Sequence, residues 1–270
     1  MITTTLTGKS LRLARLSRSG DGRFLFVPLD HSVSDGPIGD VAGFPRLVED
    51  IVAGGADGVV VHKGRARLIP ASLLSDCGLI VHLSASTAHA PDVNAKVLVG
   101  EVDEAVRLGA DAVSVHVNIG SDTEAAQLGD LGMVASECDR WGVPLLAMIY
   151  PRGPRIDNPG LPELIAHAAN IAADLGADMV KTVMAQPIER MADVVASSPL
   201  PVVVAGGGSG GDPAGLAASA MAAGCRGLAV GRRVFTSASP RLTVAELAAI
   251  VHGRAPSTES EPRTRLAGVL

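Results

Sequence analysis

The stretch LGADMVKTVMA, residues 175–185, belongs to a repeated pattern that decides the fold. The other copies are GGADGVVVHKG (54–64), LGADAVSVHVN (108–118) and the weaker AGCRGLAVGRR (223–233). In each copy a helical segment ends at glycine, the usual left-handed residue after a helix, and an apolar run rich in β-branched residues follows. The copies start 54, 67 and 48 residues apart, which is too long for one strand–helix unit and fits two.

Four further strands are therefore expected between the copies, and four apolar runs provide them: 24–30, 79–85, 144–150 and 201–207. Helix-like segments alternate with the strands at 44–53, 102–108, 124–141, 162–175, 188–196 and 213–223. Apolar strands that alternate with helices indicate a parallel sheet covered on both faces. Eight such units predict an α/β fold, a single (β/α)8 TIM barrel. The alternative, an open doubly wound sheet, usually has a glycine-rich turn after its first strand, where this chain has PLDHSVSDG (28–36).

The barrel is expected to occupy residues 1–254 as one domain, with a polar lead-in at 1–20. Residues 255–270 are polar and rich in proline and serine, which is typical of a disordered tail.

Composition excludes several classes of function. The formal charge is −5 and no basic cluster with interleaved aromatic residues is present, so nucleic-acid binding is not expected. No apolar run is long enough to span a bilayer, and the N-terminal residues lack the charged-then-apolar order expected of a signal peptide. Three cysteines, an odd number without metal-type spacing, indicate free thiols and a cytoplasmic protein. They are Cys77, Cys138 and Cys225.

Lys181 lies in the middle of an apolar strand, although lysine is among the residues least often buried. Burial disfavours the charged ammonium and makes the neutral amine available to attack a ketone, giving a Schiff base. The alternative is an ammonium that pairs with a carboxylate inside the barrel. Lys63 is a less favoured nucleophile, because a lysine at a strand end reaches solvent.

Other polar residues follow the ends of the predicted strands, where barrel active sites are built. Asp30 and Tyr150 are candidates for moving the protons that aldol chemistry requires. The glycine-rich turns at 205–211 and 230–235 follow the last two strands, a frequent position for phosphate binding. Arg232 adds a charged donor there.

A second reading of the strand ends is a metal site. His62, His82 and His116 each follow a valine near the ends of three strands, and three histidines are a plausible zinc set. However, no His-x-His pair is present, and a metal would leave Lys181 unexplained. We therefore predict no metal. A non-catalytic barrel that binds phosphosugars is a further alternative.

Taken in order, seven motifs resemble the DhnA-type class I aldolases, and within them the aminoheptulosonate synthases. They are VPLDHSVSDGP, IVHLSAST, GADAVSVHVNIGSDTE, GVPLLAMIYPRGP, LGADMVKT, VVVAGGG and GLAVGRRVF, and the match runs from about residue 8 to 253.

The resemblance implies a role for each matching residue. Lys181 is the Schiff-base nucleophile, Tyr150 the proton donor and Asp30 the proton acceptor. No cofactor is then required. Substrate-binding residues are His31, Ser32, Val33, Ser34, Pro151 and Arg152. Phosphate-binding residues are Gly206, Gly207, Gly231 and Arg232.

The resemblance also implies partners and substrates. These are phosphorylated ketose and aldehyde substrates and further copies of the chain, in a homo-oligomer that can be a decamer. The expected reaction condenses dihydroxyacetone phosphate with L-aspartate 4-semialdehyde, on the way to aminohydroxybenzoate. The alternatives are the transaldolase-type formation of 2-amino-3,7-dideoxy-D-threo-hept-6-ulosonate and fructose-bisphosphate cleavage. One departure stands out: the family's KTNYTG segment is KTVMAQ here, with Met184 and Gln186 in place of the usual tyrosine and glycine.

Overall fold

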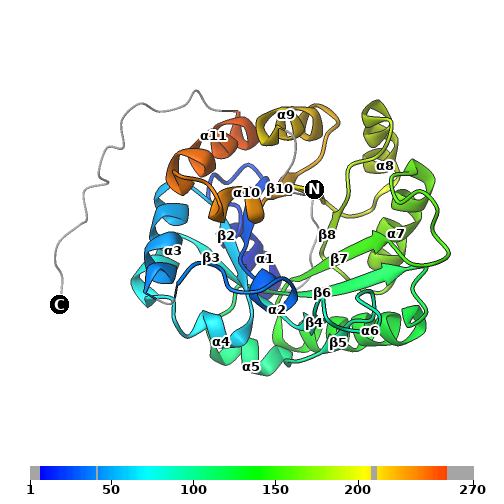
Figure 1. The fold of residues 1–270 in the computed structure, drawn as a ribbon, viewed down its shortest axis with the longest axis horizontal. Helices are drawn as coiled ribbons and strands as arrows, with labels where there is room; N and C mark the ends of the chain where they lie inside the picture. Colours follow the sequence, from blue (N-terminus) through cyan, green and yellow to red (C-terminus); the bar gives the residue numbers. More distant parts are fainter. Residues whose placement is uncertain (1–6, 41, 208–211, 254–270) are drawn as a thin grey trace.

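The computed structural model describes residues 7–40, 42–207 and 212–253 of the 270-residue chain. Eight parallel strands close into a barrel in the order β1-β10-β9-β8-β7-β6-β3-β2, which confirms the predicted TIM barrel (Figure 1). The barrel strands are β1 (Phe24–Pro28), β2 (Gly58–Val61), β3 (Gly78–His82), β6 (Ala112–Ile119), β7 (Leu145–Pro151), β8 (Met179–Thr182), β9 (Val202–Ala205) and β10 (Gly227–Ala229).

Helices surround the barrel in a ring (Figure 1). The longer ones are α3 (Gly43–Ala53), α5 (Val102–Arg107), α6 (Glu124–Trp141), α7 (Pro162–Asp174), α8 (Met191–Ser197), α9 (Pro213–Ala222) and α11 (Pro240–His252). Short helical turns lie in the connections between these elements, namely α2 (His31–Ser34), α4 (Lys63–Ala66), η1 (Ala71–Ser75), η2 (Ile188–Arg190) and α10 (Arg232–Phe235). Within the described ranges, no helix is long and apolar enough to cross a membrane.

Alternation along each strand divides the core into two layers. Leu145, Ala147 and Ile149 of β7 point outward and pack in the cluster beneath the helices. Leu146, Met148 and Tyr150 of the same strand belong to the cluster inside the barrel. Since successive side chains of a strand point to opposite faces, one register shift would exchange the two layers. The alternation of side chains along each strand therefore decides which polar residues point into the barrel and reach its mouth.

The aspartate of the repeated pattern has a structural role that explains its recurrence. The N–H of Asp178 donates to the carbonyl oxygen of Leu145 at 2.9 Å, and the N–H of Leu145 donates back to Oδ2 of Asp178 at 2.8 Å. Asp57 makes the same pair of bonds with Leu25, and Asp111 makes it with Leu79. Each aspartate thus satisfies an N–H group of the preceding barrel strand, one residue before that strand begins to pair with the next one.

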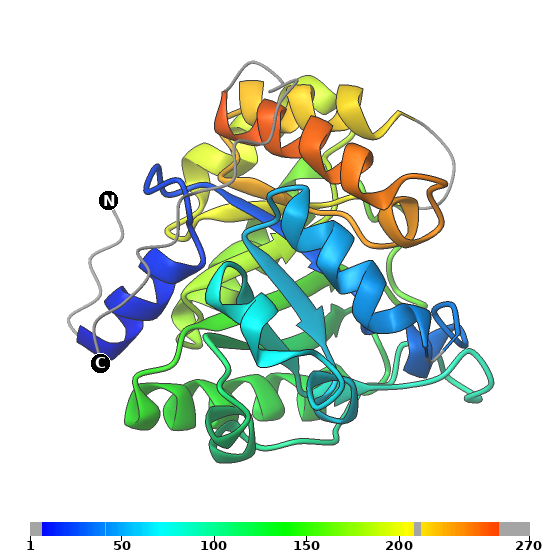
Figure 2. The same ribbon diagram turned by 90° about the vertical axis from the view of Figure 1, so that its left-hand side faces the viewer.

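The lead-in contains a helix, α1 (Thr7–Arg15), that our sequence reading did not identify. Figure 2 shows α1 beyond one end of the barrel, at the left of the view. Leu13 and Leu16 are buried in the interior cluster and close this end. A Cβ atom on Gly78 would lie only 2.4 Å from Cδ2 of Leu16, so glycine at the start of β3 leaves the space that Leu16 fills. The predicted tail, 255–270, lies outside the described residues.

The predicted strand 79–85 is divided in two. The barrel strand β3 ends at His82, and Ser84–Ala85 forms β4, which pairs antiparallel with β5 (Val97–Leu98). The division occurs because the chain folds back on itself: the N–H of Val99 donates to the carbonyl oxygen of Leu83 at 2.8 Å. The β4–β5 hairpin, residues 84–98, stands beside the mouth of the barrel.

Candidate active site

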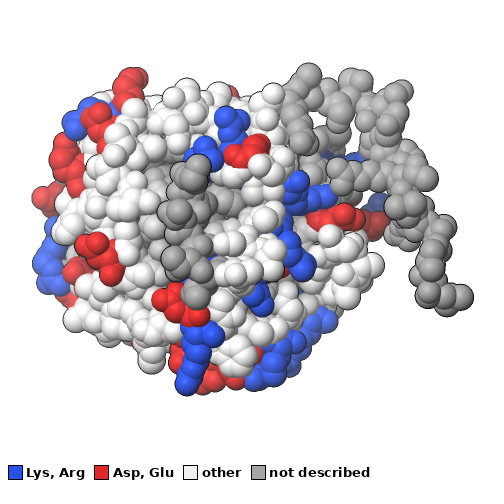
Figure 3. All heavy atoms as spheres, turned by 180° about the vertical axis from the view of Figure 1, so that it is seen from behind, with Lys and Arg blue, Asp and Glu red and all other residues white. Residues whose placement is uncertain are grey.

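A cavity of ≈ 730 Å³ opens at the carboxyl ends of the barrel strands. Most of the predicted site residues line it together: Asp30, His31, Val33, Ser34, Tyr150, Arg152, Lys181, Gly206, Gly207, Gly231 and Arg232. Ser32 and Pro151 do not line it. Pro151 has the outward parity of β7, opposite to that of Tyr150, and is buried. Figure 3 shows the opposite face of the molecule, where acidic and basic side chains are interspersed around the edge.

Lys181 points into this cavity from the middle of β8. Its side chain is 8% exposed, and Nζ lies 3.8 Å from Sδ of Met148, its partner in the β7–β8 register. Among the described residues, no carboxylate lies within ion-pair distance of Lys181. The paired-ammonium alternative therefore lacks a partner here, and the thioether is only a weak hydrogen-bond acceptor.

Asp30 lies between β1 and α2, close to two histidines. Its Oδ1 is 3.3 Å from Nδ1 of His31, and its Oδ2 is 3.9 Å from Nε2 of His82. Burial raises the pKa of Asp30, but the positive charges of His82, Lys181 and the other neighbouring histidines outweigh burial and hold the pKa below its ordinary value. Burial lowers the pKa of His82 to about 4, so His82 is neutral near pH 7.

Tyr150 lies one inward position beyond Met148 along β7, toward the mouth. The centroid of its ring is 5.0 Å from the ring centroid of His116. The guanidinium carbon of Arg152 lies 5.1 Å from the centroid of the Tyr150 ring. The side chain is buried, at 6% exposure. Because β7 is hydrogen-bonded to β8, this hydroxyl shares the cavity with the amine of Lys181.

The three histidines of the zinc alternative are each engaged in other contacts. Nδ1 of His82 lies 2.8 Å from Oγ of Ser114, and Nδ1 of His62 lies 3.1 Å from the carbonyl oxygen of His82. Nε2 of His116 bonds Oδ1 of Asn118 at 2.9 Å. Burial lowers the pKa of all three. No group of three His, Cys, Asp or Glu side chains in the described parts of the chain is arranged to hold a metal, so the zinc alternative has no ligand set there.

The two turns after β9 and β10 lie side by side at the mouth, because these strands are hydrogen-bonded neighbours. Nη2 of Arg232 lies 3.5 Å from the carbonyl oxygen of Gly207, which has a left-handed backbone (φ 69°). Gly231 precedes α10, and a Cβ atom there would lie 2.5 Å from the carbonyl oxygen of Pro28 and 2.8 Å from Cε1 of His31. Glycine is therefore required where the turn approaches β1. Residues 208–211 of the predicted phosphate turn lie outside the described residues.

Lys96 also lines the cavity, and our sequence reading did not include it. It comes from the β4–β5 hairpin, and its Nζ donates to Oγ of Ser86 and to the carbonyl oxygen of Val93. The available signal was composition, since Lys96 is one of only four lysines in the chain. Lys63, the second candidate nucleophile, does not line the cavity and pairs with Glu104 at 2.9 Å.

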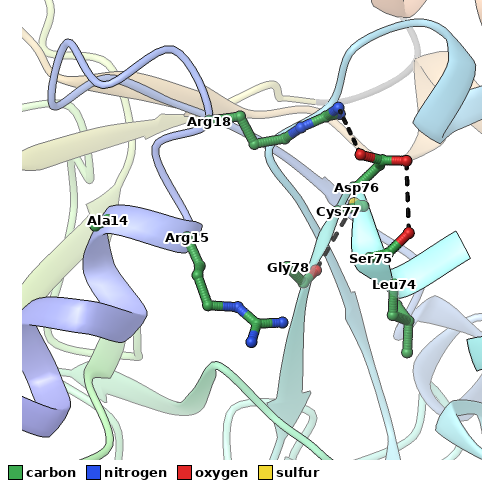
Figure 4. A pocket seen from close by; sticks show the side chains of 8 residues that line it. All are labelled: Ala14, Arg15, Arg18, Leu74, Ser75, Asp76, Cys77 and Gly78. Atoms are coloured by element: carbon green, nitrogen blue, oxygen red, sulfur yellow. Dashed lines mark hydrogen bonds and ion pairs between the residues drawn. The ribbon is translucent and has the colours of Figure 1, made fainter. Parts of the chain in front are cut away.

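A smaller hollow of ≈ 230 Å³ lies at the other end of the barrel, between α1 and η1 (Figure 4). Two arginines line it, and both have acidic partners: Arg15 pairs with Asp111 at 2.8 Å, and Arg18 lies 4.0 Å from Asp76. Burial raises the pKa of Cys77, also in its lining, to about 12, so this thiol is not a nucleophile near neutral pH. The groups with suitable chemistry are thus at the mouth.

Comparison with known proteins agrees with this geometry. Residues 24–237 match the model of a family described as DeoC/LacD family aldolase. The 2-amino-4,5-dihydroxy-6-oxo-7-(phosphonooxy)heptanoate synthase of Streptomyces griseus is 48% identical over 247 residues, which cover 90% of each chain. The 2-amino-3,7-dideoxy-D-threo-hept-6-ulosonate synthase 1 of Archaeoglobus fulgidus is 44% identical over 250 residues, which cover 92% of each chain.

Two solved aldolase structures share the fold. A Schiff-base-forming fructose-1,6-bisphosphate aldolase superimposes with a TM-score of 0.82 at 26% identity, over 90% of this chain and 99% of that one. An archaeal fructose-1,6-bisphosphate aldolase whose catalytic lysine carries a carbinolamine intermediate superimposes with a TM-score of 0.81 at 26% identity, over 91% and 100%. The expected resemblance is confirmed: the chain belongs to the DeoC/LacD family of aldolases and is a class I aldolase.

Proposed function

We propose that this aldolase joins dihydroxyacetone phosphate to L-aspartate 4-semialdehyde through a Schiff base on Lys181. The product is then 2-amino-4,5-dihydroxy-6-oxo-7-phosphoheptanoate, the compound in the name of the Streptomyces griseus relative. The observation that carries the proposal is the buried amine of Lys181, which has no ion-pair partner among the described residues and shares one cavity with Asp30 and Tyr150.

The first half of the reaction prepares the nucleophilic carbon. The amine of Lys181 adds to the ketone carbon, and loss of water from the carbinolamine leaves an iminium ion. Asp30, whose pKa the positive charges of its neighbours hold below the ordinary value, removes a proton from the adjacent carbon. The electrons of that C–H bond move toward the iminium nitrogen and give an enamine. Glycine turns and Arg232 hold the phosphate at the mouth.

The second half forms the carbon–carbon bond. The enamine carbon attacks the aldehyde carbon, and the hydroxyl of Tyr150 gives a proton to the oxygen that becomes negative. Water then adds to the regenerated iminium carbon and releases the product and the free amine of Lys181. No redox partner is consumed.

A transaldolase-type reaction that gives 2-amino-3,7-dideoxy-D-threo-hept-6-ulosonate is the second candidate. The relative from Archaeoglobus fulgidus favours it through its name. Met184 lines the cavity at the position where the family commonly has tyrosine, so the surface that contacts the substrate differs from that of the family. This difference favours a different ketone donor over the transaldolase-type reaction. Turnover of L-aspartate 4-semialdehyde with each candidate ketone donor separates these two reactions. A separate assay for cleavage of fructose 1,6-bisphosphate tests the third alternative.

Borohydride trapping tests the proposed nucleophile. Reduction in the presence of dihydroxyacetone phosphate is expected to leave a stable adduct on the peptide that contains Lys181. Lys181→Ala should abolish both the adduct and turnover while circular dichroism stays unchanged, and Lys63→Ala is the matched control that should keep both. Product formation by Lys181→Ala, or an adduct on another lysine, contradicts the mechanism. Loss of activity in EDTA without any adduct favours a metal enzyme.

A further inference from the structure

The β4–β5 hairpin brings a second cationic group to the cavity, on a support that is rigidly built. Lys96 precedes β5, and its Nζ bonds Oγ of Ser86 at the other side of the hairpin and the carbonyl oxygen of Val93 at 3.0 Å. Oγ of Ser86 also donates to the carbonyl oxygen of Val93 at 3.0 Å. These bonds fix the direction of the long lysine side chain before any ligand arrives, which reduces the entropy lost on binding.

Two buried amide side chains hold the hairpin against the barrel. The carbonyl oxygen of Asn94 accepts from Nδ2 of Asn118 at 2.8 Å and from Nε2 of Gln127 at 2.9 Å. Asn118 and Gln127 are 0% and 1% exposed. Buried amides are costly unless they are satisfied, so this hairpin position is strongly specified.

Lys96 and Arg152 face the cavity without acidic partners. In the described ranges, neither side chain forms an ion pair, in contrast to Lys9 and Lys63, which both do. Burial, followed by the nearby charge of Arg152, lowers the pKa of Lys96. Both cations also contribute, after burial, to lowering the pKa of His116. Asp30, Asp35 and Asp92 oppose this shift only in part, so an anion placed between Lys96 and Arg152 would be attracted by both cations.

Lys96 lies across the barrel from the proposed phosphate turns, and Arg152 follows β7 on the wall between the two sides. In the order β1-β10-β9-β8-β7-β6-β3-β2, the strands opposite β9 and β10 are β3 and β6. The hairpin leaves the barrel after β3, and Asn118 of β6 holds it. Lys181 on β8 and Tyr150 on β7 occupy the wall that joins the two sides. The cavity therefore has a candidate anion subsite at each end and the nucleophile between them.

We propose that Lys96 and Arg152 form a second anion subsite, which binds the carboxylate of the aldehyde acceptor. The inference rests on the proposed function, because a condensation product of that kind has a phosphate at one end and a carboxylate at the other. The lysine and the guanidinium both make charge-assisted hydrogen bonds to carboxylates. Lys96 then selects amino-acid semialdehydes over neutral aldehydes and takes no part in bond formation.

Lys96→Met tests the assignment, since it keeps the length of the side chain and removes the charge. Condensation is measured with dihydroxyacetone phosphate and three acceptors: L-aspartate 4-semialdehyde, D-glyceraldehyde 3-phosphate and propanal. We expect kcat/KM for the semialdehyde to fall about 10- to 100-fold, as for loss of a hydrogen bond to a charged group. The value for propanal should change by less than about 2-fold. Lys96→Arg should restore most of the preference, and Lys63→Met is the control.

Each other outcome overturns the proposal. An equal loss with all three acceptors means that Lys96 only supports the hairpin. A loss confined to glyceraldehyde 3-phosphate means that the subsite reads a phosphate instead of a carboxylate. Unchanged kinetics means that no subsite is present. If Lys96→Met fails to fold, the same comparison is made with Arg152→Met.

Trapping with borohydride separates this proposal from the proposed function. The dihydroxyacetone phosphate adduct on Lys181 requires no acceptor, so it should form equally in wild type and in Lys96→Met. Absence of the adduct from the wild-type enzyme refutes the proposed function. Presence of the adduct together with unchanged acceptor preference in Lys96→Met refutes only the second subsite.

Discussion

Nζ of Lys181 lies 3.8 Å from Sδ of Met148, its register partner on β7, and after His82 its positive charge helps to hold the pKa of Asp30 below its ordinary value, against the effect of burial. Removing that charge should raise the pKa of Asp30. A carboxylate whose pKa is lower in the folded state stabilises the protein at any pH above its pKa in the unfolded state. This stability is lost as pH falls through the folded pKa. In Lys181→Met the folded pKa of Asp30 should lie closer to the unfolded value, so this contribution should be smaller and its loss should be complete at a higher pH. Carboxyl carbon NMR titration checks this, and an unchanged Asp30 pKa would contradict it.

Tyr150→Phe should separate donor capture from bond formation. Removal of the proposed proton donor is expected to lower kcat about 10²- to 10⁴-fold, the usual contribution of a general acid. The phenylalanine ring keeps the contact with His116, whose ring centroid lies 5.0 Å away, so folding should be unaffected. Borohydride trapping should still place dihydroxyacetone phosphate on Lys181. Wild-type turnover by Tyr150→Phe would remove the tyrosine from the mechanism.

Asp178→Ala should strongly destabilise the barrel. Its Oδ2 accepts from the N–H of Leu145 at 2.8 Å and from the buried Nζ of Lys9 at 2.9 Å. Alanine leaves the N–H without its acceptor and weakens the pairing of a buried ammonium, so the free energy of unfolding should fall by about 3 kcal/mol. Urea denaturation measures it. The exposed partner of Lys9 is the control: Asp139→Asn should cost less than about 1 kcal/mol. Equal effects would refute the argument.

His252 should make stability depend on pH at the alkaline side. Its ring bonds Asp21 at 2.8 Å and Asp57 at 3.1 Å, and these carboxylates raise its pKa although burial opposes them. A raised pKa adds stability that is fully present below the unfolded value of about 6.5 and disappears as pH rises through the folded pKa.

The His252→Asn variant isolates this effect. Thermal or urea unfolding is measured from about pH 5 to about pH 9, the range in which histidine titrates. As pH rises, the wild type should lose its advantage in free energy of unfolding over the variant. The expected loss is about 2 kcal/mol, the usual contribution of a charge-assisted hydrogen bond. The variant should be less stable at low pH and nearly independent of pH in this window. A constant difference between the two proteins would show that packing of α11, and not charge, accounts for the effect.

The fold was predictable because its signals are local. The glycine and aspartate of the repeated pattern, followed by apolar β-branched runs, placed all eight strands near their observed positions. Helix α1 was missed because its lead-in looks polar; only Leu13 and Leu16 pack inside the barrel, and that contact depends on the closed end of the barrel. The β4–β5 hairpin was read as the end of a strand, because pairing of Ser84 with Leu98 is not local.

The sequence by itself determined the type of chemistry: an apolar strand with lysine at its centre, and strand ends with an aspartate and a tyrosine. Tertiary structure decided which polar residues share one cavity. Strand parity turned Tyr150 inward and Pro151 outward, and the hairpin brought Lys96 to a mouth formed by strands far from it in sequence. The physical reason is that alternation and propensity are properties of neighbours along the chain, whereas closure of the barrel sets the distances between its opposite walls.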